Sequence, residues 1–149
     1  MSVIDKPIAE FISKHHVLTL ATCQGDEAYC ANMFYVFLEE EGCFIFTSDK
    51  DTRHISDISH NLYVAGSIVL ETETVGKIQG LQFQGMAFEV TDELKKKAKK
   101  AYLKRFPYAV LSSTPLWAVE LTYAKYTNNM LGFGKKLIWQ KGLLDGMKW

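Results

Sequence analysis

The spacing of apolar residues along the chain alternates between the period of a strand and that of a helix. Most segments are short runs rich in β-branched and aromatic residues, or alternate apolar with polar positions as half-buried strands do. In the longest run, Leu81 and Phe83 alternate with glutamines, and Gly80 and Gly85 suggest a bulge or a close backbone approach. The expected strands are residues 17–22, 29–38, 43–47, 63–70, 78–90, 117–121, 123–127 and 137–140.

Three other segments carry apolar residues at helical spacing. The first helix is expected within 7–16 with Asp5 as a candidate cap, the second within 52–60, and the third from Asp92 to a stop before Pro107. Strands outnumber helices, and the first connections are too short for the crossovers that parallel strands need. The pattern predicts a mainly β fold, an antiparallel barrel with peripheral helices at the N-terminus, after the third strand and in the C-terminal half.

Composition adds few constraints to this picture. With 149 residues, of which 48% are hydrophobic, the chain is long enough to bury one hydrophobic core of ordinary size. We therefore expect a single domain covering 1–149. Seventeen basic and seventeen acidic residues cancel, which gives no overall charge for a polyanionic partner or a membrane surface. No signal-peptide pattern opens the chain and no apolar run approaches the roughly 20 residues of a membrane helix. We therefore expect a cytoplasmic protein.

Residue types that bind metals are scattered along the chain. The cysteines are odd in number, include no CxxC pair and lie in strand-like runs, which predicts buried free thiols rather than disulfides or a zinc site. Two histidines are adjacent and cannot face the same way on a helix, and the other two lack i,i+4 spacing, so no metal site is expected. These residues are Cys23, Cys30, Cys43, His15, His16, His54 and His60.

The segment 44–61, FIFTSDKDTRHISDISHN, combines a buried strand, a hydroxyl-rich turn and the start of a helix that carries Arg53. A helix N-terminus has unpaired backbone N–H groups and partial positive charge, so this segment is a candidate phosphate site. Asp49 and Asp51 would repel a phosphate unless they point outward or cap the helix. The alternative is an ordinary capped helix in which Arg53 pairs with Asp57, four residues later.

Other motifs favour structural interpretations. The segment 94–105 holds seven of the seventeen positive charges and would attract nucleic acid, but no base-reading motif accompanies it, which favours a solvated helix face. Gly132 to Lys136 lacks the spacing and the hydroxyl residue of a phosphate-binding loop and is expected to form a turn. Trp117 and Trp139 are expected in the core or at an interface.

The order of these elements resembles that of the FMN-binding split barrels related to pyridoxamine 5′-phosphate oxidase. The layout from Ile8 to Leu121 carries this resemblance. The motifs CANMFYVF, TRHIS, KIQGLQFQG, AYLKRFP and LGFGKKLIW are similar to the YhbP-like family of small bacterial proteins over nearly the whole chain. The resemblance implies an antiparallel split β-barrel and a homodimer with FMN bound in two clefts at the subunit interface.

The resemblance also implies which residues would contact the flavin. Thr47 and Ser48 match a strand-end pair, and Thr52, Arg53 and His54 match a Ser-Arg-Lys pattern, which together hold the FMN phosphate in the family. The residues implied along the flavin ring are Asn32 and Met33 in the strand 30–34, and Gln79, Gln82 and Gln84 in the later strand that supplies a glutamine.

Two departures from the family pattern limit what the resemblance implies. His54 replaces a lysine, so a fixed charge gives way to a group that is neutral or partly charged near pH 7. The Arg-x-His substrate motif of the oxidase has no counterpart, so pyridoxamine 5′-phosphate oxidation itself is not implied. We expect an FMN-binding oxidoreductase that acts on an unidentified small molecule, with no acid–base residue assigned. The alternative is a non-catalytic carrier of flavin or haem on the same fold.

Overall fold

The computed structural model describes residues 3–111 and 113–142, and the strands in this part of the chain form one antiparallel sheet. The strands are β1 (Val17–Gln24), β2 (Glu27–Phe34), β3 (Val36–Leu38), β4 (Cys43–Thr47), β5 (Tyr63–Val69), β6 (Gln79–Glu89), β7 (Leu116–Asn128) and β8 (Lys136–Gln140). The helices are α1 (Lys6–Lys14), α2 (Arg53–His60) and α3 (Asp92–Arg105), with short 3₁₀ turns η1 (Val75–Lys77), η2 (Pro107–Leu111) and η3 (Asn129–Leu131).

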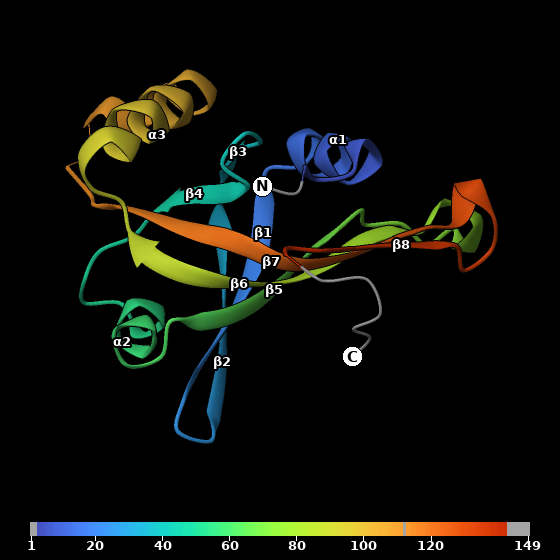
Figure 1. The fold of residues 1–149 in the computed structure, drawn as a ribbon, viewed down its shortest axis with the longest axis horizontal. Coiled ribbons are helices and arrows are strands. Elements are labelled where there is room, and N and C mark those ends of the chain that lie inside the picture. Colours follow the sequence, from blue (N-terminus) through green and yellow to red (C-terminus); the bar gives the residue numbers. More distant parts are fainter. Residues whose placement is uncertain (1–2, 112, 143–149) are drawn as a thin grey trace.

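The sheet curls into a half-barrel whose strand order is β2-β1-β5-β6-β7-β4-β3, with β8 added on β7. Figure 1 shows α1 and α3 above the long strands and α2 below them. The prediction of a mainly β, antiparallel split barrel with peripheral helices is confirmed. Within the described residues, no helix has both the length and the apolar composition needed to cross a membrane.

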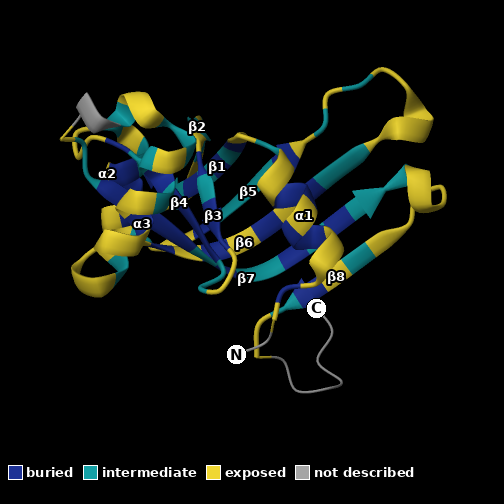
Figure 2. Ribbon diagram, turned by 90° about the horizontal axis from the view of Figure 1, so that it is seen from above, coloured by how far each residue is buried: buried dark blue, intermediate teal, exposed yellow. Residues whose placement is uncertain are grey.

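Two apolar clusters lie on opposite faces of the sheet, as the alternation along β4 shows. Phe44 and Phe46 belong to the larger cluster, inside the barrel, whereas Cys43 and Ile45 belong to a smaller one. Inside the barrel, α1 and α2 bury their apolar faces; on the other side, α3 buries Ala98 and Tyr102 against β4 and β7. Figure 2 shows the buried residues concentrated in the middle of the long strands. Trp117 and Trp139 are both buried in the larger cluster, as predicted.

The predicted strand 29–38 is two strands. β2 ends at Phe34 and β3 begins at Val36, because the buried Tyr35 between them turns its hydroxyl to the Ile12 carbonyl oxygen, 2.5 Å away. The prediction of three buried thiols holds for Cys43 alone, because Cys23 is partly exposed and Cys30 is exposed. Cys30 lies at an outward position of β2, an edge strand, and no other described residue covers it.

The two predicted strands 117–121 and 123–127 are one strand, β7, which continues through a bulge. Gln84 of β6 pairs with Tyr123 while Gly85 pairs with Leu121, so Thr122 is the extra residue on β7. The suggestion of a bulge or close approach is thus confirmed at Gly85. At Gly80 the register is unbroken, so the structure places no bulge there.

Gly85→Ala should destabilise the fold because an added Cβ would lie 2.5 Å from the Glu120 carbonyl oxygen and 2.7 Å from Val119 Cγ1. We expect the free energy of unfolding to fall by about 1–3 kcal/mol, the usual cost of overpacking. Gly80→Ala is the matched control in the same strand, because its Cβ would meet only the Ile68 carbonyl oxygen at 3.7 Å. Urea denaturation measures both; equal midpoints for the two variants would contradict this interpretation.

Candidate cofactor site

The predicted phosphate site lies between the end of β4 and the start of α2. Ser48 is buried, and its Oγ lies 2.6 Å from His54 Nε2 and 3.2 Å from Thr52 Oγ1. The backbone fixes this position, because the Ser48 carbonyl accepts a hydrogen bond from Trp117 Nε1 at 3.0 Å. The structure therefore brings three of the predicted residues together.

The N-terminus of α2 keeps its hydrogen-bond donors available. Thr52 is the N-cap residue, but its side chain makes no capping hydrogen bond to the helix. Instead its hydroxyl donates to the Asp49 carbonyl at 2.9 Å. No acidic residue lies in the first turn of α2 to neutralise the helix dipole. The first-turn N–H groups, which have no partners within a helix, are suited to an anion.

Arg53 extends from α2 toward β2 rather than along its own helix. Its guanidinium lies 4.5 Å from the centre of the Tyr29 ring, and Nη2 lies 3.5 Å from Glu27 Oε2. The alternative pair of Arg53 with Asp57 does not form, since the buried Asp57 carboxylate accepts the Thr22 hydroxyl at 2.8 Å. The Arg53 side chain is 52% exposed, so its contact with Glu27 is a weak, solvent-screened pair that an incoming phosphate can replace.

His54 adds hydrogen bonding but no charge to this group. Burial lowers the pKa of His54 below its ordinary value of 6.5, and the nearby Asp57 carboxylate opposes this shift only in part. The ring is therefore neutral at pH 7. Arg53 and the helix dipole remain the positive features of the site. The carboxylates of Glu27, Asp51 and Asp57, which line the same open groove of about 730 Å³, oppose them.

Two of the predicted side chains point elsewhere. Thr47 is the last residue of β4 and directly precedes Ser48, so its side chain faces the opposite side of the sheet. There its Oγ1 lies 3.3 Å from the Tyr102 hydroxyl on α3. Met33 pairs with Leu18 and packs against the barrel core. Neither side chain joins the group formed by Ser48 and its neighbours.

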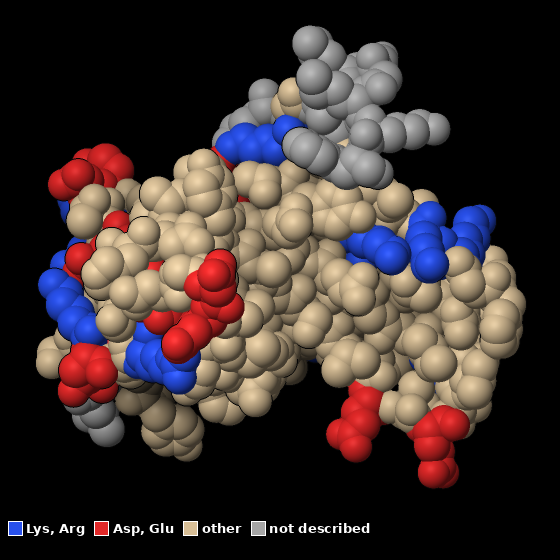
Figure 3. All heavy atoms as spheres, turned by 90° about the horizontal axis from the view of Figure 1, so that it is seen from below, with Lys and Arg blue, Asp and Glu red and all other residues tan. Residues whose placement is uncertain are grey.

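Asn32 and Gln82 lie on a surface that we call the outer face, formed by outward residues of β1, β2, β5, β6 and β7. The Thr19 hydroxyl donates to Asn32 Oδ1 at 2.8 Å. The residues of the outer face are Thr19, Ala21, Cys30, Asn32, Ala65, Ser67, Gln82, Gln84 and Tyr123. These residues are uncharged and many are small; Lys125, which pairs with Gln82 across β6 and β7 and faces the same side, adds a positive charge beside them. Figure 3, seen from the side of the β1–β2 hairpin, shows a broad area free of charged side chains between charged groups at the two ends.

Sequence reasoning missed most of the outer face. A signal for it exists in the alternate small residues Thr19 and Ala21 of β1 and Ala65 and Ser67 of β5, which face each other across the pair. Small side chains at outward positions leave room for a ligand or a second protein surface. A shallow cavity of about 400 Å³ lies over them.

Gln79 is at the far end of β6 from the phosphate site. Its Oε1 accepts the Tyr126 hydroxyl at 3.0 Å, beside η3. The opposite end, Glu89, pairs with Trp117, which in turn pairs with Phe46, two residues before Ser48. An eleven-residue strand spans roughly 33 Å, so Gln79 and Ser48 are not brought together within one chain.

Comparison with known proteins gives a family and a set of structural neighbours. Residues 4–128 match the family model described as pyridoxamine 5′-phosphate oxidase. A UPF0306 protein of Photorhabdus laumondii is 40% identical over 134 residues, which cover 90% of this chain and 94% of that protein. A heme binding protein from Mycobacterium smegmatis has a similar structure, with a TM-score of 0.75 at 16% identity, over 93% of this chain and 60% of that one. A FAD-binding protein from Mesorhizobium loti aligns with a TM-score of 0.66 at 11% identity, over 81% of this chain and 92% of that one.

Proposed function

The chain belongs to the pyridoxamine 5′-phosphate oxidase family and is related to the UPF0306 proteins, and on that premise we propose that it binds FMN. The flavin phosphate is held by Ser48, Thr52, Arg53 and the start of α2, on the inner side of β1 and β2, and in a homodimer the ring reaches the outer face of the partner subunit. The bound flavin then serves an oxidoreductase whose small-molecule substrate is unidentified.

The observation that carries this proposal is the convergence of donors at the β4–α2 turn. Two hydroxyls lie 3.2 Å apart beside a helix start without a side-chain cap, and Arg53 is the adjoining cation. A dianionic phosphate can accept hydrogen bonds from the helix start, Arg53 and the hydroxyls, provided that the Thr52 hydroxyl turns away from the Asp49 carbonyl to which it now donates. The residues present therefore fit the phosphate end of FMN, although the neutral His54 makes the site less positive than a Ser-Arg-Lys pattern would.

The outer face fits the ring and a second copy of the chain. Apart from the adjoining Lys125 it is uncharged. Asn32, Gln82 and Gln84 supply amide groups that can hydrogen-bond to the polar edge of a flavin. Because Gln79 lies at the far end of β6 from Arg53, a homodimer is the arrangement in which both could contact flavins, with Gln79 reaching the one held by the partner.

Bound FMN supplies the hydride or electron transfer, and the chain's own residues bind and orient it. Arg53 fixes the phosphate, and the amides of the outer face align the ring. Thr19 holds the Asn32 amide in position through its hydrogen bond. We assign no residue to proton transfer.

The proposal is tested with purified protein, FMN, riboflavin and haemin. FMN at about a hundred times its dissociation constant should raise the melting temperature by about 5–10 °C. Riboflavin, which lacks the phosphate, should give a much smaller shift. No stabilisation by FMN, or equal stabilisation by riboflavin, would overturn the assignment of the phosphate site.

Haem is the second candidate, because the neighbour with a TM-score of 0.75 is a heme binding protein and the outer face can receive a flat ring. The outer face offers Cys30 and Tyr123 as potential iron ligands. A haemin-induced absorption band that is lost in Cys30→Ala, together with no response to FMN, would favour haem over flavin.

His54→Lys should tighten FMN binding about fivefold, the effect of roughly 1 kcal/mol for one charge near a phosphate in a water-exposed site. The reason is that burial holds the pKa of His54 below its ordinary value, so the native ring contributes no charge at pH 7. Riboflavin is the control, since its affinity should not change. Fluorescence titration measures both ligands; a gain for riboflavin as large as that for FMN would contradict the phosphate assignment.

A further inference from the structure

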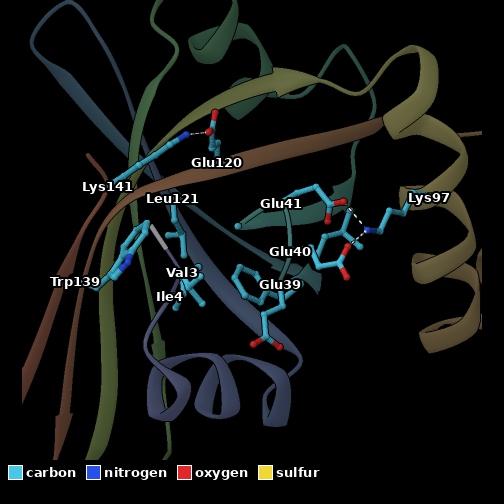
Figure 4. Close-up of a pocket in the computed structure, with 13 residues that line it drawn as sticks. Val3, Ile4, Glu39, Glu40, Glu41, Lys97, Glu120, Leu121, Trp139 and Lys141 are labelled. Carbon is cyan, nitrogen blue, oxygen red and sulfur yellow. Dashed lines mark hydrogen bonds and ion pairs between the residues drawn. The ribbon is translucent and has the colours of Figure 1, made fainter. Parts of the chain in front are cut away.

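A second cavity, of about 740 Å³, lies between the chain leading into α1, the β3–β4 turn, α3 and β8. Figure 4 shows the Trp139 indole on one side of it and the carboxylates of the β3–β4 turn on the other, toward α3. None of the residues lining it belongs to the phosphate site or to the outer face. Its apolar lining is Val3, Ile4, Phe37, Leu38, Leu121 and Trp139.

Two fully buried polar atoms on the side chains lining this cavity have no hydrogen-bond partner in the described part of the chain. Trp139 is 8% exposed, and its Nε1 donor is unpartnered. Glu41 Oε2 is an unpartnered acceptor, although the other oxygen of the same carboxylate pairs with Lys97 at 2.5 Å. Buried indole N–H groups and carboxylate oxygens usually have partners, because leaving them unpaired is costly. Both atoms lie below the surface of the cavity, so a ligand pairs with them when the Trp139 or Glu41 side chain turns toward it.

The charges around the cavity favour a cation. Four glutamates line it and only two lysines, so two negative charges are uncompensated. Lys97 pairs with Glu40 and Glu41, and Lys141 pairs with Glu120. The Glu39 carboxylate has no ion pair or hydrogen bond among residues 3–111 and 113–142. These carboxylates stand at the edge of an apolar lining, which is the arrangement of a site for an amphipathic ligand.

We propose that this cavity binds a small organic amine with an aromatic or other apolar body. The ammonium group lies against Glu39 and Glu41, and a turn of the Glu41 side chain brings its unpartnered oxygen to the ligand. The body packs against Phe37 and Trp139, whose rings also attract a cation. A hydroxyl or carbonyl oxygen on the ligand accepts the hydrogen bond of Trp139 Nε1 when the indole turns toward it. The volume lies within the usual range for small-molecule sites.

Tyramine is the probe, because it combines an ammonium group, an aromatic ring and a phenol oxygen. Titration of ¹⁵N-labelled protein should shift the indole N–H resonance of Trp139, which Trp139→Phe identifies by its loss. The matched probe 4-ethylphenol, which lacks the amine, should bind at least about tenfold more weakly, because it leaves the Glu41 oxygen unpaired. Equal affinities for the two probes, or no shift of the Trp139 resonance with tyramine, would overturn the proposal.

Two variants test the contacts with the ammonium group. Glu39→Gln and Glu41→Gln should each weaken tyramine binding by about tenfold in calorimetry. The control is Glu73→Gln, an exposed glutamate that does not line the cavity and should change nothing. Glu39 is exposed, so its replacement leaves the fold intact even if Glu41→Gln disturbs the pair with Lys97. Unchanged tyramine affinity in Glu39→Gln and Glu41→Gln would refute the assigned ammonium site.

Discussion

Arg53→Ala should lower FMN affinity by about a hundredfold, since an arginine that pairs with a phosphate supplies charge-assisted hydrogen bonds of up to about 3 kcal/mol. Arg53 is the only arginine or lysine among the described residues that line the groove at the start of α2. The neutral His54 cannot take over its charge. The loss should therefore be larger than in a family member that keeps a lysine at the position of His54.

The effect of Arg53→Ala is separable from a change in folding. The side chain is half exposed, and its one ion pair, to Glu27, is 3.5 Å long, so the variant should unfold at nearly the same urea concentration as the parent. Riboflavin affinity should also be unchanged. Arg53→Lys should recover part of the FMN affinity, because lysine keeps the charge but not the two-pronged geometry of the guanidinium.

Glu27→Gln provides an independent check on the same contact. In the free protein, Glu27 competes with a phosphate for Arg53, so its neutralisation should raise FMN affinity slightly. Fluorescence titration of all variants at fixed salt gives the comparison. If Arg53→Ala binds FMN as tightly as the parent, the phosphate is not at the β4–α2 turn, and the flavin assignment fails at its most specific point.

The alternation of apolar and polar residues was sufficient to predict the positions of the strands, because each strand has one face on the barrel core. It did not predict where a strand is broken or continued. The break at Tyr35 depends on a hydrogen bond to Ile12, 23 residues away, and the continuity of β7 depends on Gly85 of the neighbouring strand. Both features depend on a contact with another segment, α1 for the break and β6 for the continuity, and not on the sequence of the strand itself.

Only some residues of the candidate site could be predicted from the sequence, again because contacts between distant segments decide which side chains meet. Residues adjacent in the chain can be separated by the sheet, as Thr47 and Ser48 are, and a motif match does not show which of them faces the ligand. Much of the outer face consists of small uncharged residues on β1 and β5, which carry no chemical signature of their own. The cavity beside Trp139 joins segments about 100 residues apart, and no local pattern relates Glu41 to Trp139.

Arg105 differs from the lysines that precede it in the basic run 94–105, which was interpreted as a solvated helix face. Its guanidinium donates to the carbonyl oxygens of Tyr35 at 3.2 Å, Ser13 at 3.2 Å and His15 at 2.5 Å. It also lies 5.5 Å from the centre of the Tyr35 ring. One side chain at the end of α3 thus connects the end of α1 with the break between β2 and β3.

Arg105→Ala should therefore lower the free energy of unfolding by about 3 kcal/mol, because three carbonyl oxygens lose a charged donor at once. Lys104→Ala, at the adjacent exposed position, is the matched control and should change stability by less than about 0.5 kcal/mol. Arg105→Lys should fall between the two, since an ammonium group cannot span three acceptors as a planar guanidinium does. Urea denaturation separates these outcomes. Equal stabilities of Arg105→Ala and Lys104→Ala would mean that water replaces the guanidinium without cost and that α1 and α3 are held together by apolar packing alone.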